Sequence, residues 1–227
     1  MPPQVLLSWS GGKDAAWALH LLRTRGDVEV VGLLATLDAD AARSSMQGVD
    51  AGVLRAQARA AGLPLLETAL PPAASNAAYE QALGGALAQA RQRWPRLDTL
   101  ATGDLLLEDL RAWREASLAR LGWRLSTPLF GSDTAALAGA MLRDGLRARV
   151  CCVDTQQLDP VFAGRRFDAA LLQALPDAVD PCGEHGEFHT CVDDGPMFDG
   201  AIPLAQGSTW LRDGRFAVTD FALRNPG

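Results

Sequence analysis

The segment that most constrains the fold is a short apolar run that stops at two adjacent glycines and continues as a helix-forming stretch. Residues 5–7 are Val-Leu-Leu, Gly11 and Gly12 follow, and residues 15–25 are rich in Ala and Leu. This order predicts a buried strand, a tight turn and a helix. Such a turn aims backbone N–H groups at one point, and the positive end of the helix dipole lies behind them. We therefore expect an anion-binding loop, and phosphate is the usual anion.

The residues around the glycines distinguish between kinds of phosphate-binding loop. The Walker-type loop requires a glycine five residues before its Gly-Lys pair, and here that position is Leu7. The dinucleotide-binding pattern G-x-G-x-x-G is also missing. Residues 10–14 (Ser-Gly-Gly-Lys-Asp) instead resemble the S-G-G-x-D-S loop of PP-loop ATP pyrophosphatases, which hold the β- and γ-phosphates while ATP is cleaved between α and β. Ala15 replaces the last serine of that pattern and removes one hydroxyl.

Lys13 is the only lysine of the chain, and all other Lys or Arg residues are arginines. A compact ammonium group suits a tight glycine turn as a point charge on phosphate, whereas a planar guanidinium does not. The position of this single lysine favours a role in phosphate binding. An ordinary strand-to-helix turn with a surface lysine is the competing interpretation.

The composition excludes several function classes. Of the 227 residues, 27 are acidic and 21 are Lys or Arg, with a net charge of −6 and no Lys/Arg-rich block. Extended contact with nucleic acid is therefore not expected. Because no apolar run reaches the length of a membrane span and no signal-peptide pattern begins the chain, we expect no membrane contact and a cytoplasmic location. The cysteines form neither a C-x-x-C pair nor a zinc pattern, which favours reduced thiols.

Strand-like and helix-like segments alternate through the first half of the chain. After the first unit, strands are expected at 28–37, 65–68 and 99–103, and helices at 49–61, 76–93 and 108–121. Four such units predict an α/β fold with a parallel, doubly wound sheet and right-handed crossovers. Ligands of such sheets lie beyond the carboxyl ends of the strands. Residues 10–14, 38–48 and 103–111 are therefore expected to meet at one edge.

The pattern changes after Arg124. Residues 127–131 (Thr-Pro-Leu-Phe-Gly) are expected to be a linker between an N-terminal domain, residues 1–128, and a second, smaller α+β domain, residues 129–227. In the smaller domain we expect helices at 132–146 and 168–175, a strand at 148–153, and a β-hairpin over 208–221 that turns at Asp213-Gly214. Residues 156–166 show no clear period, and the sequence indicates no packing face for Phe162 or Phe167.

A second polar stretch, residues 182–190 (Cys-Gly-Glu-His-Gly-Glu-Phe-His-Thr), contains two of the three histidines. As an extended strand, it would place His185, Glu187 and His189 on one face. These side chains could bind a metal ion, grip a substrate and transfer protons, or form a polar edge strand without chemistry. A zinc deaminase does not fit, because no P-C-x-x-C pattern follows.

Three segments together resemble the diphthine–ammonia ligase family. They are the loop at 10–14, residues 103–111 (Gly-Asp-Leu-Leu-Leu-Glu-Asp-Leu-Arg), and residues 183–190, of which 184–190 are similar to the family pattern E-[GN]-G-E-[FY]-[EH]-T. The resemblance runs from about residue 6 to residue 198. His185 replaces the usual Gly or Asn, and Asp104 and His189 are similar to the bacterial branch of the family. The chain thus resembles a divergent bacterial-type member with a changed acceptor pocket.

This resemblance implies a PP-loop (adenine nucleotide alpha hydrolase-like, HUP-like) N-terminal domain and a C-terminal domain that completes the cleft. The family joins ammonia to a carboxylate with ATP and releases AMP and pyrophosphate. A carboxylate is a poor electrophile, so it is first adenylated, and ammonia then displaces AMP. ATP and Mg²⁺ are the expected cofactors, and ammonia and a small-molecule or protein-borne carboxylate are the expected partners. A homodimer is compatible with the sequence.

The resemblance also implies roles for individual residues. The expected catalytic residues are Lys13, Asp14, Glu184, His185, Glu187 and His189, of which the histidines transfer protons. The expected nucleotide-binding residues are Ser8, Ser10, Gly11, Gly12, Lys13, Asp14, Asp38, Gly103 and Asp104. Asp14 and Asp104 are the expected Mg²⁺ ligands, and Gly186 and Thr190 contact the substrate. Glu108, Arg111 and Glu115 have the helical spacing i, i+3, i+7, and this face is expected either to bind substrate or to form a solvated ion-pair stripe.

Two other functions stay open from the sequence. The first is a PP-loop enzyme that modifies tRNA, although the acidic balance and the missing cysteine motif count against it. The second is a nucleotide-binding regulator that does not turn ATP over. If the chain is bacterial, we expect an acceptor other than diphthine, because the family's known acceptor belongs to archaeal and eukaryotic elongation factors.

Overall fold

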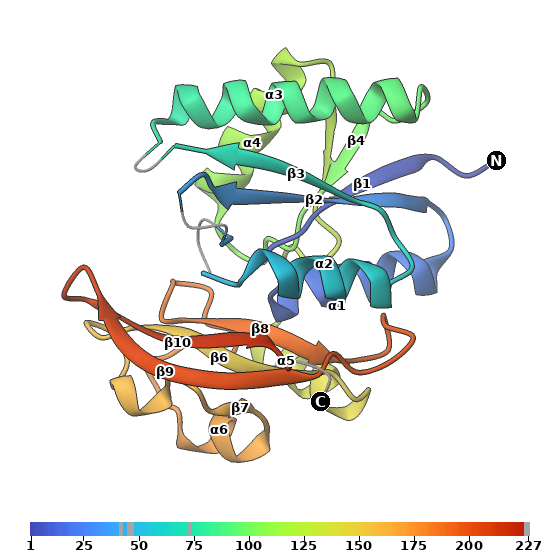
Figure 1. Ribbon diagram of the computed structural model, residues 1–227. Helices are drawn as coiled ribbons and strands as arrows, with labels where there is room; N and C mark the ends of the chain where they lie inside the picture. The colour runs from blue at the N-terminus through green and yellow to red at the C-terminus, as the bar shows by residue number, and fades with distance from the viewer. Residues whose placement is uncertain (41–42, 45–47, 72–73, 225–227) are drawn as a thin grey trace.

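The computed structural model describes residues 1–40, 43–44, 48–71 and 74–224. The chain forms two β-sheets that lie one above the other, with helices between them and outside them (Figure 1). Among the described residues, none of the helices combines the length and the apolar character that a membrane crossing needs.

The first sheet has five parallel strands in the order β3-β2-β1-β4-β5. They are β1 (Gln4–Ser8), β2 (Glu29–Asp38), β3 (Leu65–Leu70), β4 (Thr99–Ala101) and β5 (Arg124–Ser126). Residues 5–7 are buried because helices cover both faces of this central strand. The expected doubly wound α/β sheet is therefore confirmed. The change of pattern at Arg124 does not mark its end, however, because residues 124–126 pair with β4 as a short edge strand.

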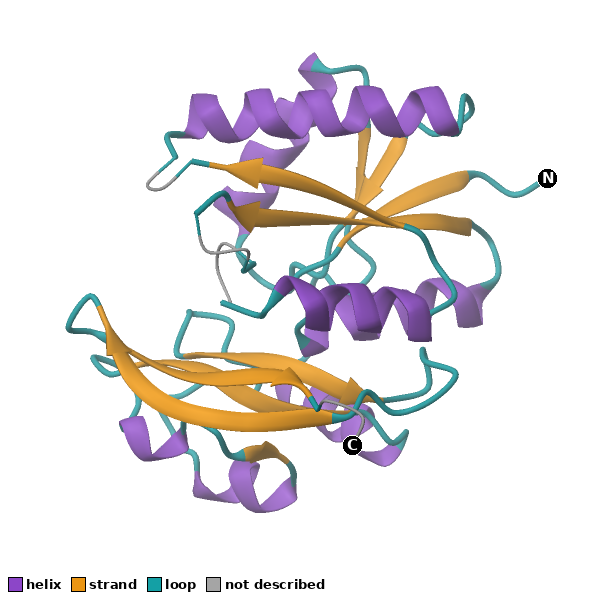
Figure 2. Ribbon diagram, in the orientation of Figure 1, coloured by secondary structure: helices purple, strands orange, loops and turns teal. Residues whose placement is uncertain are grey.

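Two pairs of helices cover the first sheet. α1 (Lys13–Arg25) and α2 (Ala51–Ala60) lie on the face toward the second sheet, and α3 (Asn76–Arg93) and α4 (Glu108–Arg120) lie on the opposite face (Figure 2). Asp50 and Ser75 cap α2 and α3, since each side chain accepts a hydrogen bond from a backbone N–H of the first turn. Helices that begin near the carboxyl edge of this sheet therefore lie on both of its faces.

The second sheet is antiparallel and belongs to the smaller α+β domain. Its order is β7 (Arg166–Phe167), β6 (Arg147–Asp154), β10 (Phe216–Leu223) and β9 (Leu204–Arg212), and β8 (Phe188–Asp194) also pairs with β6. α5 (Thr134–Arg143), a 3₁₀ turn (Pro160–Phe162) and α6 (Ala169–Ala174) complete this part. The hairpin of β9 and β10 turns at Asp213-Gly214 as predicted. Phe162 and Phe167, for which the sequence indicated no face, are both buried.

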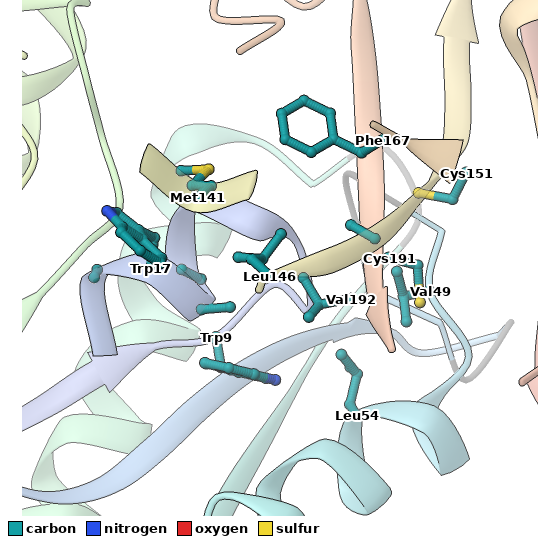
Figure 3. Packing of buried hydrophobic residues seen from close by; sticks show 14 of the residues in the cluster. Trp9, Trp17, Val49, Leu54, Met141, Leu146, Cys151, Phe167, Cys191 and Val192 are labelled. Carbon is teal, nitrogen blue, oxygen red and sulfur yellow. The ribbon is translucent and has the colours of Figure 1, made fainter. Parts of the chain in front are cut away.

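The main hydrophobic core is continuous between the two sheets. It joins Trp9 and Trp17 with Leu54 of α2 and with Cys191 and Val192 of β8 (Figure 3). A smaller core lies between the first sheet and the helices α3 and α4. α1 and α2 are therefore packed against apolar side chains on both sides. The expected boundary between residues 128 and 129 lies in the connection from β5 to α5, and it stays a prediction.

Gln57 of α2 is fully buried and connects three segments of this core. Its Oε1 accepts a hydrogen bond from Trp9 Nε1 at 2.9 Å, and its Nε2 donates to the carbonyl oxygens of Gly11 at 3.0 Å and Val192 at 2.8 Å. Gln57→Leu leaves these buried groups without their partner, so we expect the free energy of unfolding to fall by about 3 kcal/mol. Urea denaturation measures the loss. Gln92→Leu, at an exposed position of α3, is the control, and an equal loss in both variants would contradict the prediction.

Candidate functional site

A cavity of about 530 Å³ lies at the carboxyl edge of the first sheet. The lining comes from the ends of β1, β2 and β4, from α1, α3 and α4, and from β8 and the turn before it. This is the edge where ligands of doubly wound sheets bind. The predicted site residues among its lining are Ser8, Ser10, Gly12, Lys13, Asp14, Gly103, Asp104, Glu184, His185, Gly186, His189 and Thr190.

The glycine loop is tied to the smaller domain by backbone hydrogen bonds. Gly11 is buried behind the lining with a φ of 81°, and a side chain there would collide with Leu54. Its carbonyl oxygen accepts from Val192 N–H at 3.0 Å. The N–H of Lys13, at the start of α1, donates to Thr190 Oγ1 at 3.0 Å. Thr190 therefore caps α1 from the second sheet, in addition to lining the cavity.

Lys13 is 2% exposed, and its ammonium group is bound inside the protein. Nζ donates to both carboxylate oxygens of Asp14 at 2.9 Å and to the carbonyl oxygen of Cys182. The ring centroids of Phe167 and Phe188 lie 5.8 and 5.6 Å from it. Burial opposes the charged form, but Asp14 and the other nearby groups outweigh it and raise the pKa of Lys13. The charge that the sequence assigned to phosphate is thus paired with Asp14 inside α1, and the hydrogen bond from Lys13 to Cys182 connects α1 to the smaller domain.

Asp14 and Asp104, the two expected metal ligands, both line the cavity. Burial raises the pKa of Asp14, and the charge of Lys13 partly offsets this. Asp104 Oδ2 accepts from Thr102 Oγ1 at 2.8 Å and lies 3.2 Å from Arg114 Nε. In the part of the chain that the structure describes, no three His, Cys, Asp or Glu side chains meet to hold a metal ion. Two carboxylates still suit Mg²⁺, which takes one or two of them together with phosphate oxygens.

The residues before β8 form a turn and not the extended strand considered from the sequence. Gly183 and Gly186 have φ values of 69° and 84°, and β8 begins only at Phe188. A backbone with these two left-handed residues cannot alternate its side chains. The placement of His185, Glu187 and His189 on one strand face is therefore wrong.

The two glutamates of this turn accept hydrogen bonds from backbone N–H groups. Glu187 accepts two within its own turn, each at 2.9 Å, and lies outside the cavity lining. Glu184 lines the cavity and accepts from the N–H groups of Leu105 at 3.2 Å and Leu106 at 2.9 Å. Burial raises the pKa of Glu184. Glu187 thus holds the turn in shape, and Glu184 connects it to the segment between β4 and α4.

The two histidines of the motif occupy different environments. His189 lines the cavity from β8, and burial, together with the charges of Lys13 and Arg212, lowers its pKa to about 4. It is therefore neutral at pH 7. His185 also lines the cavity but is exposed.

Comparison with known families covers both parts of the chain that meet at this cavity. A model described as the diphthamide synthase N-terminal domain matches residues 3–125, and one described as the diphthamide synthase C-terminal domain matches residues 133–218. The chain belongs to the diphthamide synthase family. No curated protein matches it. The resemblance to diphthine–ammonia ligases is thereby confirmed over nearly the whole chain.

Five of the predicted site residues do not line the cavity in this diphthamide synthase family member: Gly11 and Glu187, described above, and Asp38, Glu108 and Arg111. Asp38, at the end of β2, has a pKa raised by burial, which the charge of Arg212 partly offsets. Glu108 is exposed, and the guanidinium of Arg111 lies 4.3 Å from the ring centroid of Phe130. All three side chains lie outside the cavity lining.

Other residues of the lining were not among the predicted site residues. They are Trp9, Ala15, Thr36, Ser44, Tyr79, Thr102, Leu107, Leu110, Arg114, Cys182, Gly183 and Phe188. Leu107, Leu110 and Arg114 have the spacing i, i+3, i+7, which puts them on one face of α4. The neighbouring face with Glu108 and Arg111 has the same kind of spacing, so periodicity alone could not choose between them. The sequence therefore carried no signal that favoured the correct face.

The lowered pKa of His189 predicts that stability depends on pH. An unfolded histidine binds a proton near pH 6.5, whereas the folded protein accepts it only at about pH 4. Between these values the unfolded chain binds more protons, so this group lowers the free energy of unfolding by about 3 kcal/mol as the pH falls from 7 to 4. Urea denaturation at several pH values compares the protein with His189→Gln. The free energy of unfolding of the unaltered protein should fall relative to that of His189→Gln as the pH falls. A difference between the two proteins that stays constant with pH would contradict the prediction.

Proposed function

We propose that this protein is an ATP-dependent, AMP-forming amide ligase that adenylates a carboxylate and lets ammonia displace AMP. One observation carries the proposal: the glycine loop, the carboxylates of Asp14 and Asp104, and the Glu184 turn line one cavity. Membership of the diphthamide synthase family supports the ligase class. The acceptor is a small-molecule or protein-borne carboxylate.

In the first step, an oxygen of the acceptor carboxylate attacks the α-phosphorus of ATP, and the bond to the β-phosphate breaks. Pyrophosphate leaves with the negative charge that develops on it. The positive end of the α1 dipole favours this charge. Lys13 acts here by holding Asp14 at the loop, because its own N–H groups are bound to Asp14 and Cys182.

In the second step, ammonia attacks the activated acyl carbon, the bond to the AMP oxygen breaks, and the nitrogen loses a proton. His189 is neutral at pH 7 and lines the cavity, so a ring nitrogen is available to accept that proton. Asp14 and Asp104 would hold Mg²⁺, which neutralises and polarises phosphate oxygens. The hydrogen bonds from the N–H groups of residues 105 and 106 to Glu184 hold the smaller domain against the segment between β4 and α4.

The test follows ATP labelled at the α-phosphate in one sample and at the γ-phosphate in another, each incubated with Mg²⁺, ammonium and a panel of carboxylates that includes a diphthine peptide. We expect AMP and pyrophosphate in equal amounts, and only when a carboxylate is present. ADP and orthophosphate would contradict the proposal. The absence of any turnover, with nucleotide still bound, would favour a regulator. AMP release that requires bulk tRNA in place of the carboxylate would favour a tRNA-modifying enzyme.

A further inference from the structure

Two cations of the cavity lining use their donors in different ways. Lys13 gives all its ammonium N–H bonds to the protein. Arg114 of α4, whose side chain is 17% exposed, has a buried Nε that makes no hydrogen bond in the described structure. This Nε lies 3.2 Å from Asp104 Oδ2 without hydrogen-bond geometry. Nη1 donates to Tyr79 Oη at 3.4 Å, near the upper limit for such a bond.

A guanidinium group carries five N–H donors in a rigid fork. Buried donors without acceptors are unfavourable, and a planar anion can satisfy two of them at once. Asp104 forms an ion pair with Nε, and among the described residues the Nη groups have Tyr79 as their one hydrogen-bond partner. Arg114 is therefore left with donors that suit an anionic ligand in the cavity.

The side chains around Arg114 indicate which kind of anion fits. The phenol of Tyr79 comes from α3, and Leu107 and Leu110 come from the same face of α4. Leu107 is 40% exposed, so its apolar side chain is accessible in the cavity wall. A charged fork, a hydroxyl and an apolar wall together suit a carboxylate that is attached to an apolar chain.

The position of Arg114 separates it from the glycine loop. α1, which follows the loop, lies on one face of the first sheet, whereas α3 and α4 lie on the other (Figure 1). In the proposed function, the triphosphate lies at the start of α1, where the helix dipole favours an anion. A second anion at Arg114 would approach the α-phosphate from across the sheet edge, with its charge neutralised by the guanidinium.

We infer that Arg114, with Tyr79, binds the carboxylate of the acceptor. The inference rests on the proposed function only in taking the acceptor to be a carboxylate. Arg114→Gln removes the charge at similar length, Arg114→Lys keeps the charge without the fork, and Tyr79→Phe removes the hydroxyl. Arg120→Gln is the matched control, because Arg120 lies on the same helix and pairs with Glu80 at the surface.

Two calorimetric titrations test the inference. The first uses the α,β-methylene analogue of ATP with Mg²⁺, and the second titrates the protein saturated with that analogue with a panel of aliphatic and aromatic carboxylates. We expect equal analogue affinity in all variants. Carboxylate affinity should fall about 10- to 100-fold in Arg114→Gln, less in Arg114→Lys and Tyr79→Phe, and stay unchanged in Arg120→Gln.

A tenfold loss of analogue affinity in Arg114→Gln would assign the guanidinium to the triphosphate and overturn the inference. Equal carboxylate affinity in Arg114→Gln and the unaltered protein, or no carboxylate binding to the unaltered protein, would also overturn it. Carboxylate binding that depends on Arg114, without AMP release in the labelled-ATP assay, would support this site and contradict the proposed ligase reaction.

Discussion

Asp14→Asn is expected to lower AMP release at least a thousandfold, which corresponds to about 4 kcal/mol of lost transition-state stabilisation. Asparagine keeps the shape of the side chain but removes the charge that pairs with Lys13 at 2.9 Å. The buried ammonium group then keeps only a neutral partner, the carbonyl oxygen of Cys182. The proposed Mg²⁺ site loses one of its two carboxylates as well. Rates of AMP formation from labelled ATP measure the effect.

Asp109→Asn is the control for this prediction, since Asp109 is an exposed acidic residue in the first turn of α4. Its rate should stay within about twofold of the unaltered protein, as is usual for a surface change. Thermal unfolding of Asp14→Asn separates a chemical loss from a folding loss. If Asp14→Asn kept more than a tenth of the activity, neither the ion pair nor the metal role of Asp14 would hold.

Gly103→Ala is expected to damage both stability and activity, because the backbone after β4 touches the start of α1. A Cβ at Gly103 would lie 2.8 Å from the carbonyl carbon of Asp14 and 2.9 Å from the nitrogen of Ala15. These are backbone atoms, so α1 or the β4–α4 segment must move. We expect the free energy of unfolding to fall by about 3 kcal/mol and AMP release to fall about 100-fold.

Gly85→Ala is the matched control for Gly103→Ala. Gly85 lies in α3, and an added Cβ would meet no atom within 4 Å. Alanine is the better helix former, so this variant should gain about 1 kcal/mol of stability and keep its activity. Urea denaturation and the labelled-ATP assay give both numbers. A Gly103→Ala protein with unaltered activity would show that the approach of the two segments is not needed for the reaction.

The sequence predicted the parts of the fold that depend on local pattern. The turn at Asp213-Gly214, the helix from Asn76 and the order of the first strand and helix all follow from turn residues, caps and apolar periodicity. β5 was missed because three residues that begin with Arg124 show no alternation. Short edge strands are fixed by pairing with a neighbour, which local sequence does not contain.

The sequence predicted which segments form the candidate site, but it did not predict what each residue contacts there. The loop at 10–14 and the Glu184 turn were found from their residues, and both line the cavity. The hydrogen bond from Lys13 N–H to Thr190, however, joins residues 177 positions apart. The face that α4 turns to the cavity likewise depends on how the helix packs. Such contacts are set by the tertiary structure, which is why Arg114 carried no signal of its own.

The continuous core between the two sheets has a consequence during synthesis. The first sheet is complete once Ser126 has left the ribosome, yet the apolar sides of α1 and α2 find their cover only in strands made later. At about 5–20 residues per second, the remaining hundred or so residues take roughly 5–20 s to appear. During this time the apolar surface of the nascent first half is exposed, and chaperones that bind apolar surfaces are expected to bind it. A chain truncated after the first sheet would leave the apolar sides of α1 and α2 exposed, and we expect it to aggregate.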